Sequence, residues 1–178
     1  MRLNDPARIA ALDASGQMDA APHEALDRLA RLTAHLLNVP AATISFLDAQ
    51  HQRIRSAFGM ADTEDGLIPA ESMCARVVES EQPLAIPLMD DTQRRSVGTN
   101  AVAYLGVPLC CASGETLGCL AVTDVKPREW SAAEIDLLRD MAAVIMAEID
   151  LETDARRRTR IEDQRPLDEE RFRTLVEG

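Results

Sequence analysis

Aromatic side chains are scarce in this chain of 178 residues, where one Tyr, one Trp and three Phe make up 3% of the sequence. Large planar cofactors such as haem or flavin are commonly held by stacking against aromatic rings in a roomy apolar pocket. The composition therefore argues against either cofactor. It favours a small polar ligand, or no ligand at all.

The sequence also lacks a metal-binding pattern. No C-x-x-C pair occurs among its cysteines, and its three histidines are scattered. Cys110 and Cys111 are neighbours on a predicted strand, so they point to opposite faces and do not form a tetrahedral site. We interpret Cys74, Cys110, Cys111 and Cys119 as small buried side chains in a reducing compartment. The alternative is redox sensing or catalysis by Cys74 or Cys110.

Basic clusters and long apolar runs are missing as well. The net charge is −11, and no cluster of Lys or Arg occurs before Arg156. Binding to nucleic acid or to an anionic membrane therefore lacks electrostatic support. No N-terminal run resembles a signal peptide, and no segment approaches the ~20 apolar residues that span a bilayer. We expect a cytoplasmic protein without nucleic-acid or membrane partners.

A hairpin is the clearest feature that is present. Two apolar runs, 104–109 and 117–124, predict short buried strands, and Ser113-Gly114 between them supplies the positive φ that a tight turn needs. Beyond the second strand, Ser131 and Glu134 have the spacing of a capping box, which predicts the start of a long amphipathic helix.

The first half of the chain predicts two helices followed by two strands. Pro6 after Asn4-Asp5 is typical of a helix start, and apolar residues at three-to-four spacing indicate a second, amphipathic helix. The expected elements are helices over 4–15 and 22–37, ended by Ser15-Gly16 and Asn38-Val39-Pro40, and strands over 42–48 and 52–59.

The order of these elements, with Lys126-Pro127-Arg128-Glu129-Trp130-Ser131 before the long helix, resembles a GAF domain, the small sensor module of bacterial signalling proteins. The resemblance covers about Arg2 to Leu151. It implies an α+β fold with a central, mostly antiparallel sheet of five or six strands. The N-terminal and last helices are expected on one face, and a helix over 72–79 with a lid on the other. It implies sensing rather than catalysis.

The known ligand classes of this family leave the cofactor unknown. Covalent bilin attachment usually needs a Cys-His pair, whereas Ala75 and Arg76 follow Cys74. The Asn-Lys-x-x-x-Phe signature of cyclic-nucleotide binders is missing. Members that reduce free methionine sulfoxide carry a Cys-Asp segment that this sequence lacks, so such an enzyme stays only as an alternative. The segments 72–78, 84–87 and 90–94 match an ordinary subfamily whose ligands are largely undefined.

The resemblance also indicates where a ligand pocket would lie, on the sheet face opposite the packing helices. A short lid, Ser96 to Val102, is expected beside it. Asp91, Arg94 and Arg95 have a second interpretation as a solvated loop with weak surface ion pairs, and an anion site at the arginines stays open. The candidate ligand-binding residues are Ser45, Cys74, Asp91, Arg94, Tyr104 and Thr123.

The C-terminal part predicts a dimer and the beginning of another domain. The apolar stripe of the last helix is expected to pair with a second copy, together with the N-terminal helices. Residues 1–151 would form the GAF domain and 152–166 a charged helical linker. Pro166 is expected to break the helix and Asp168 to cap a new one, because 167–178 resembles the opening of a PAS domain. The predicted dimer residues are Leu138, Met141, Ile145 and Ile149.

These features together predict a regulatory sensor and dimerisation module of a larger bacterial signalling protein. Its output domain in the same chain would be a histidine kinase, a phosphatase or a cyclase, and the sequence contains none of their motifs. Two alternatives stay open. One is a cysteine-dependent redox sensor or methionine sulfoxide reductase-like enzyme, and the other is a ligand-free dimerisation scaffold.

Overall fold

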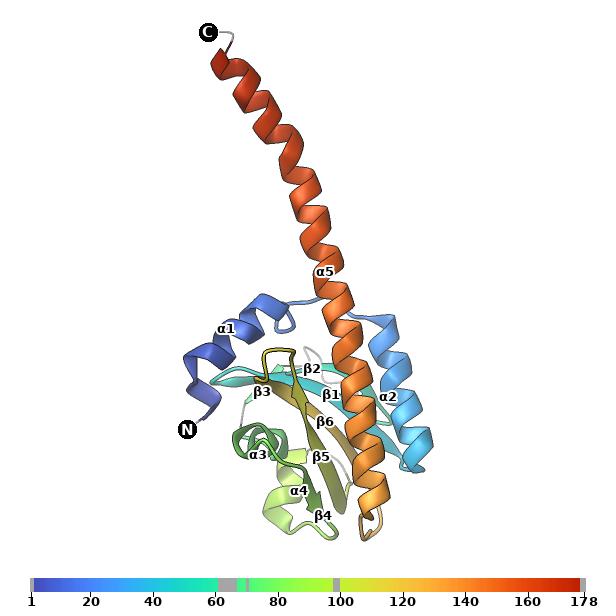
Figure 1. Cartoon of the computed structure of the whole chain (residues 1–178). Coiled ribbons are helices and arrows are strands. Elements are labelled where there is room, and N and C mark those ends of the chain that lie inside the picture. Colours follow the sequence, from blue (N-terminus) through green and yellow to red (C-terminus); the bar gives the residue numbers. More distant parts are fainter. Residues whose placement is uncertain (1, 61–66, 70, 98–99, 177–178) are drawn as a thin grey trace.

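The computed structural model describes residues 2–60, 67–69, 71–97 and 100–176 (Figure 1). Helices and strands form an α+β arrangement, as expected. In chain order the elements are η1 Arg2–Asn4, α1 Pro6–Ser15, α2 Glu24–Leu37, β1 Ala41–Leu47, β2 His51–Phe58, β3 Leu67–Pro69, α3 Met73–Ser80, β4 Leu84–Ile86, α4 Asp91–Val97, β5 Ala103–Cys110, β6 Thr116–Asp124 and α5 Ala132–Val176.

One six-stranded sheet organises the fold, with the strand order β3-β2-β1-β6-β5-β4. Every neighbouring pair is antiparallel. Ile44 of β1 pairs with Leu120 of β6, which in turn pairs with Val107 of β5, so the two halves of the chain share the sheet. This confirms the expected central antiparallel sheet. The short strand β3 at its edge was not predicted.

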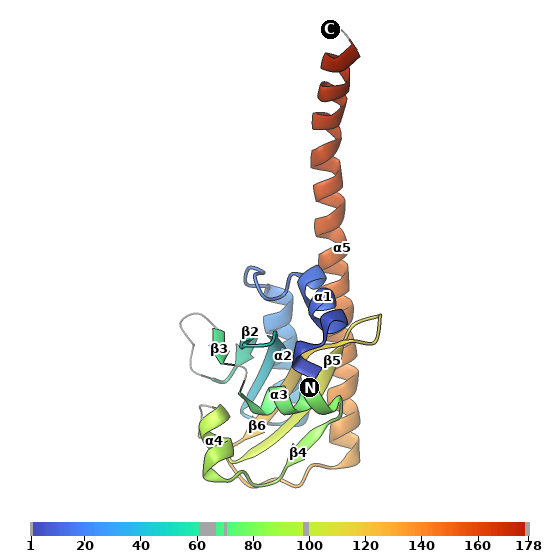
Figure 2. The ribbon, with the colours of Figure 1, turned by 90° about the vertical axis from the view of Figure 1, so that its left-hand side faces the viewer.

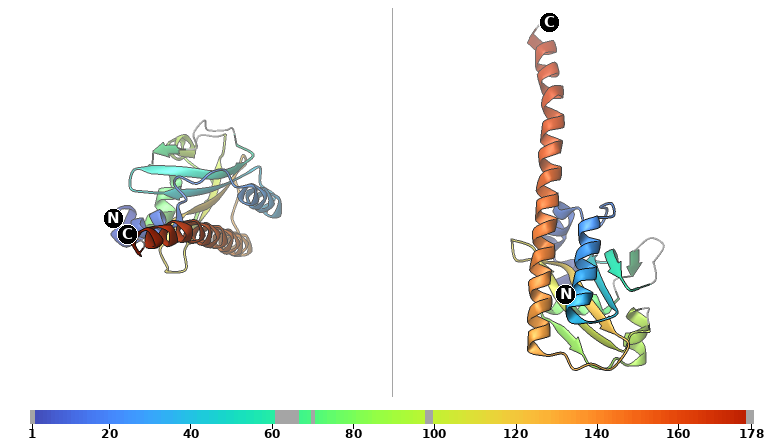
Figure 3. Two further views of the ribbon diagram at one scale, coloured as in Figure 1. Left: turned by 90° about the horizontal axis from the view of Figure 1, so that it is seen from above. Right: turned by 90° about the vertical axis from the view of Figure 1, so that its right-hand side faces the viewer.

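Helices cover both faces of the sheet (Figures 2 and 3). On one face, α2 and α5 enclose an apolar core with side chains such as Ile44, Leu120 and Val122. On the other face, α3 packs against Cys119 and Ala121, which alternate with those residues along β6. The expected placement of the helices is therefore confirmed for α2, α5 and α3.

The ends of several helices follow the local sequence. The Asp5 side chain accepts hydrogen bonds from two amides of α1, and Gly16 ends that helix in the left-handed conformation. The capping box is present: the Ser131 amide donates to Glu134 Oε2 at 2.8 Å, and the Glu134 amide donates to Ser131 Oγ at 3.3 Å. Helix α2 begins at Glu24 rather than at Pro22.

The last helix corrects two expectations. First, α5 continues through Pro166 to Val176, so Pro166 does not break it and Asp168 caps no new helix. A proline removes one N–H donor and kinks a helix, and the acidic and basic helix-forming residues on both sides continue the helical backbone. The domain boundaries drawn at 151 and 166 stay predictions.

Second, the expected dimer residues belong to the core of a single chain. Leu138, Met141, Ile145 and Ile149 are all buried against the sheet and α2. The reason is that the apolar helix-side face of β5 and β6 must itself be covered, and this stripe of α5 covers it. Their assignment to a dimer interface is therefore corrected. Among the side chains of α5 that the structure describes, the large apolar ones that are exposed are Val144, Leu151 and Ile161. Within the described ranges, no helix combines the length and apolar character needed to cross a bilayer.

Candidate functional site

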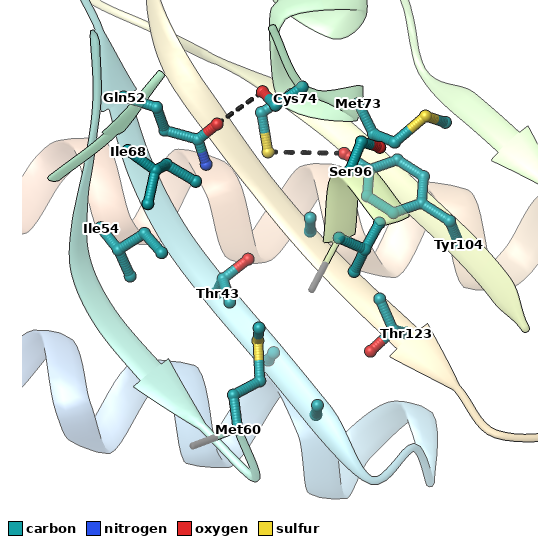
Figure 4. A pocket seen from close by; sticks show the side chains of 15 residues that line it. Thr43, Gln52, Ile54, Met60, Ile68, Met73, Cys74, Ser96, Tyr104 and Thr123 are labelled. Atoms are coloured by element: carbon teal, nitrogen blue, oxygen red, sulfur yellow. Dashed lines mark hydrogen bonds between the residues drawn. The ribbon is translucent and has the colours of Figure 1, made fainter. Parts of the chain in front are cut away.

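A small cavity of about 40 Å³ lies on the α3 side of the sheet (Figure 4). A buried water needs about 10–15 Å³ in this measure, whereas ligand pockets usually enclose about 300–1,000 Å³. The cavity therefore holds a few waters or a ligand of similar size. Its lining residues are Ala41, Ala42, Thr43, Gln52, Ile54, Met60, Ile68, Ser72, Met73, Cys74, Ser96, Val97, Tyr104, Ala121 and Thr123.

Three of the six predicted site residues line this cavity, namely Cys74, Tyr104 and Thr123. Ser45 is buried just behind the wall, where its hydroxyl accepts a hydrogen bond from Gln52. Gln52 was missed, although its place two residues before Ile54 on a strand put both on one face.

Asp91 and Arg94 lie on α4 but do not reach the cavity. Asp91 is exposed in the first turn, and Arg94 Nε donates to the carbonyl oxygen of Met89 at 3.1 Å. Helix α4 lines the cavity with Ser96 and Val97 instead. The segment expected as a loop is thus a short helix. Residues 98 and 99 of the expected lid lie outside the described residues.

A chain of hydrogen bonds connects α3 to the sheet beside the cavity. Ser72 Oγ donates to Gln52 Oε1 at 2.5 Å, and Gln52 Nε2 donates to Ser45 Oγ at 3.0 Å. Ser72 Oγ also accepts from the Ala75 amide at 3.2 Å, so the same hydroxyl caps α3. Gln52 of β2 thus links α3, through Ser72, to β1, through Ser45.

Two thiols and a phenol form a buried cluster next to this network. The hydroxyl of Tyr104 lies 3.5 Å from Cys74 Sγ and 3.5 Å from Cys119 Sγ. A Cβ on Gly106 would lie 2.5 Å from that hydroxyl, so glycine leaves the room that the ring occupies. The interpretation of buried cysteines is confirmed for Cys74 and Cys119, but it is wrong for Cys110, which is exposed.

Burial sets the protonation of this cluster. It raises the pKa of the Tyr104 hydroxyl and of the Cys119 thiol well above their usual ranges, so both stay protonated. Interaction with the Cys119 side chain lowers the pKa of the Cys74 thiol more than burial raises it. Hydrogen bonds with Tyr104 and Gln52 lower this pKa further. Cys74 is therefore the acidic thiol of the pair.

A β-bulge in β2 directs a second group of residues to the opposite face. Ile44 pairs with Ser56 and Ser45 pairs with Ile54, which leaves Arg55 as the extra residue. Bulges re-aim side chains in this way. Arg55 Nε donates to Gln17 Oε1 at 3.0 Å, and Nη1 donates to the carbonyl oxygens of residues 20 and 21.

Arg55 belongs to a charged cluster where α5 leaves the domain. His23 Nε2 lies 3.7 Å from Glu152 Oε1 and 3.9 Å from Glu148 Oε1. Burial lowers the pKa of the Arg55 guanidinium, and Glu152 is the main charge that opposes this effect. Arg55 Nη2, Glu152 Oε2 and His23 Nδ1 are buried without a hydrogen-bond partner among the described residues. The cluster therefore holds opposite charges close together with part of its hydrogen-bonding capacity unused.

A shallower hollow of about 300 Å³ lies beside α1, lined by Asp5, Arg8, Glu81, Ser113, Gly114 and Glu115. Its basic side chain, Arg8, donates to the carbonyl oxygens of Leu3 and Leu47 at 2.7 Å. The guanidinium thus holds α1 and η1 to the sheet. Across the part of the chain that the structure describes, no group of His, Cys, Asp and Glu side chains could hold a metal ion.

Known proteins have a similar sequence and architecture. The family model described as GAF domain matches residues 21–149. The GAF domain of an Acinetobacter phosphoenolpyruvate-protein phosphotransferase superposes with a TM-score of 0.63 at 19% identity, over 82% of this chain and 94% of that one. A domain of a putative two-component sensor histidine kinase from Sinorhizobium meliloti gives 0.62 at 19% identity, over 76% and 96%.

A curated relative is similar in sequence. A cyclic di-GMP phosphodiesterase of Pseudomonas aeruginosa is 25% identical over 151 residues, which cover 82% of this chain and 26% of the relative. The match thus spans about a quarter of that protein.

Proposed function

The chain belongs to the GAF domain family, and from that premise we propose that it is the small-molecule-sensing and dimerisation module of a larger signal-transduction protein. One observation carries the proposal. Strand β2 presents Gln52 and Ile54 to the cavity on one face. On the other face it presents Arg55 to the part of α5 around Glu152, where this helix leaves the domain, which we call the root of α5. A single strand thus joins a binding cavity to the helix that leaves the domain.

The relay we propose runs through the bulge in β2. A ligand that binds Gln52 or Ile54 preferentially in one position of β2 favours that position, because a ligand shifts a conformational equilibrium by its differential affinity. Arg55 moves with the strand, while its partners lie in the α1–α2 connection and near Glu152. The charged cluster then changes how α5 is held at its root.

Dimerisation is proposed through the exposed stripe of α5, defined as Val144, Leu151 and Ile161. These residues are 49%, 68% and 63% exposed, and their spacings of seven and ten residues are those of a heptad core. Beyond Thr153, α5 is exposed wherever its side chains are described, and an isolated helix is marginally stable in water. A second copy in parallel orientation would cover this stripe. The neighbouring helix α2 also exposes Leu32 and Leu36.

The output is proposed to be another domain of the same protein, namely a sensor kinase, a phosphatase, a cyclase or, as in the Pseudomonas relative, a cyclic di-GMP phosphodiesterase. The module itself is proposed to be regulatory rather than catalytic and to act in the cytoplasm. It binds no nucleic acid or membrane in this proposal, because its net charge is −11.

A second candidate function is favoured by the size of the cavity. At about 40 Å³, it is far below the usual volume of a ligand site. A filled interior is what a ligand-free dimerisation scaffold needs. In that case the exposed stripe of α5 alone would carry the function.

Titration calorimetry of the reduced chain with anions and polar compounds of a few heavy atoms tests the proposal. If the chain binds a ligand in this cavity, at least one compound should give a heat of binding. Ala121→Leu, which fills the cavity from β6, should abolish this heat. Ala143→Leu, at an exposed position of α5, should leave it unchanged. Circular dichroism checks that both variants fold. Absence of heat from the whole panel, with a dimer in sedimentation, would replace the sensor by the scaffold.

A further inference from the structure

Two cysteines far apart in the sequence share one buried hydrogen-bond partner. Cys74 comes from α3 and Cys119 from β6, and each sulfur lies 3.5 Å from the Tyr104 hydroxyl. All three side chains are buried. The fold thus brings together two free thiols, and among the described residues neither belongs to a group that could hold a metal ion.

The cavity gives a small molecule access to one of them. Cys74 lines the cavity, whereas Cys119 lies behind it and is fully buried. The volume of about 40 Å³ accommodates a few waters, since one water needs about 10–15 Å³. Hydrogen peroxide, with two heavy atoms, fits such a space. A larger oxidant such as a glutathione disulfide does not.

The surroundings of Cys74 favour its thiolate, which is the reactive form. Cys74 is the second residue of α3, behind the N-cap Ser72, where free amides and the helix dipole stabilise negative charge. Cys119 and Tyr104 stay protonated, and the Tyr104 hydroxyl, 3.5 Å from the Cys74 sulfur, is placed to donate a hydrogen bond to its thiolate. These contacts lower the pKa of the Cys74 thiol despite its burial.

We propose that Cys74 and Cys119 form a peroxide-oxidised thiol pair, in which Cys74 is attacked first and Cys119 resolves it to an intradomain disulfide. The Cys74 thiolate attacks one peroxide oxygen, the O–O bond breaks, and Cys74 becomes a sulfenic acid while hydroxide leaves. The Cys119 sulfur then attacks Cys74, and the sulfenic oxygen leaves as water with the Cys119 proton. Two thiols are oxidised by two electrons, and one peroxide is reduced to two waters.

The disulfide would change the wall of the cavity. It would tie α3 covalently to β6, and the Tyr104 hydroxyl would lose both thiol partners. Modification of this kind goes beyond the binding of a reversible ligand, and it does not depend on any ligand binding. Peroxide would then be a second signal, separate from a reversible ligand, that acts at the same cavity.

The experiment exposes the reduced full chain to hydrogen peroxide and maps its peptides by mass spectrometry without reduction. A Cys110→Ser/Cys111→Ser background removes the more accessible thiols. There we expect a cross-linked peptide pair that contains Cys74 and Cys119, with the loss of two hydrogen atoms. Cys119→Ser in this background should stop at the sulfenic acid of Cys74, which is read as a gain of one oxygen atom and is trapped by dimedone once the oxidised protein is denatured. Cys74→Ser should leave Cys119 reduced.

The same oxidation in denaturing urea is the control for chance pairing. A cross-link that forms at least tenfold faster in the folded chain than in urea supports the proposal. Tyr104→Phe keeps the ring and provides a second folded protein in which the same comparison is made. Folded wild-type protein whose oxidation is confined to Cys110 and Cys111 would overturn it. So would a Cys74–Cys119 link that forms no faster than in urea. Calorimetry on reduced protein tests ligand sensing separately, so the two proposals fail independently.

Discussion

Gly118 of β6 lies directly against the carbonyl oxygen of Ser45 on β1, so that a Cβ on Gly118 would be 2.0 Å from that oxygen. Gly118 pairs with Phe46, at the junction of the two central strands. Only a residue without a side chain allows this approach. Ser45 itself, and Cys119, which follows Gly118, both belong to the region around the cavity.

Gly118→Ala should therefore separate β1 from β6 and lower the free energy of unfolding by about 2–4 kcal/mol. Gly114→Ala is the matched control, because a Cβ there meets open space and only the positive φ costs about 1 kcal/mol. Urea denaturation measures both. Equal losses in the two variants would contradict the close contact.

Arg128 connects the start of α5 to α2 and should be sensitive to substitution. Its guanidinium donates to Glu134 Oε1 at 2.6 Å, to Asp124 Oδ2 at 3.0 Å and to the carbonyl oxygen of Leu37 at 2.6 Å, and it stacks over Trp130. Arg128→Ala should cost about 2–3 kcal/mol of stability, since charged hydrogen bonds are lost together. Arg128→Lys should recover only part of it, because lysine lacks the planar fork. Thermal melts at one pH compare the variants.

The same contact predicts a loss of stability in acid. Burial raises the pKa of Glu134, but hydrogen bonds from Arg128 and Ser131 outweigh it and hold this pKa below its usual range. A carboxylate with a lowered folded-state pKa contributes stability above its unfolded pKa, and loses it as pH falls through the folded pKa. Glu134→Gln should thus destabilise the chain at neutral pH and flatten the slope of stability below about pH 4.5. An unchanged slope would show that Glu134 is not the group responsible.

Two neighbouring positions on α5 should behave differently. Ile145→Asp places a charge in the core and should unfold the chain, whereas Val144→Asp/Leu151→Asp changes only exposed positions and should leave the circular dichroism spectrum unchanged. Sedimentation of the second variant should show weaker association by at least tenfold, since about 1.5–3 kcal/mol per buried aliphatic side chain is lost. A wild-type chain that is monomeric at high micromolar concentration would contradict the dimer.

The charged cluster at the root of α5 gives a further expectation. Arg55→Met keeps an unbranched side chain but leaves the carbonyl oxygens of Ala20 and Ala21 without their donor and the carboxylate of Glu152 without its counter-charge. Amide exchange at the root of α5 should become faster while the centre of the sheet stays protected. Arg31→Met, at an exposed position of α2, is the control. Uniform loss of protection would indicate general unfolding instead.

Local patterns predicted much of the fold because their causes are local. The hairpin, the helix caps and the capping box at Ser131 and Glu134 depend on residues a few positions apart. The resemblance to GAF domains predicted that Cys74, Tyr104 and Thr123 lie at the pocket. These three do line the cavity.

The remaining features depend on long-range pairing. Val144 and Ile145 are adjacent apolar residues, and only the position of the sheet decides that Ile145 is core and Val144 exposed. The bulge at Arg55 interrupts strand alternation, and it arises from the register of β2 on β1, which the sequence of β2 alone does not reveal. Likewise, Asp91 and Arg94 do not line the cavity, because α4 packs Val97 against the core on the α3 side and leaves Asp91 exposed.

The continuity of α5 has a consequence for the angular phase of whatever lies beyond it. A helix advances by about 100° per residue, so the core that fixes Ile145 also fixes the direction in which every later residue points. Inserting one residue after Thr153 would leave the core intact and swing the distant end by about 100°, whereas seven residues would return it to within about 20°. In the relay proposed above, the number of residues in the exposed segment would therefore matter as much as their chemistry.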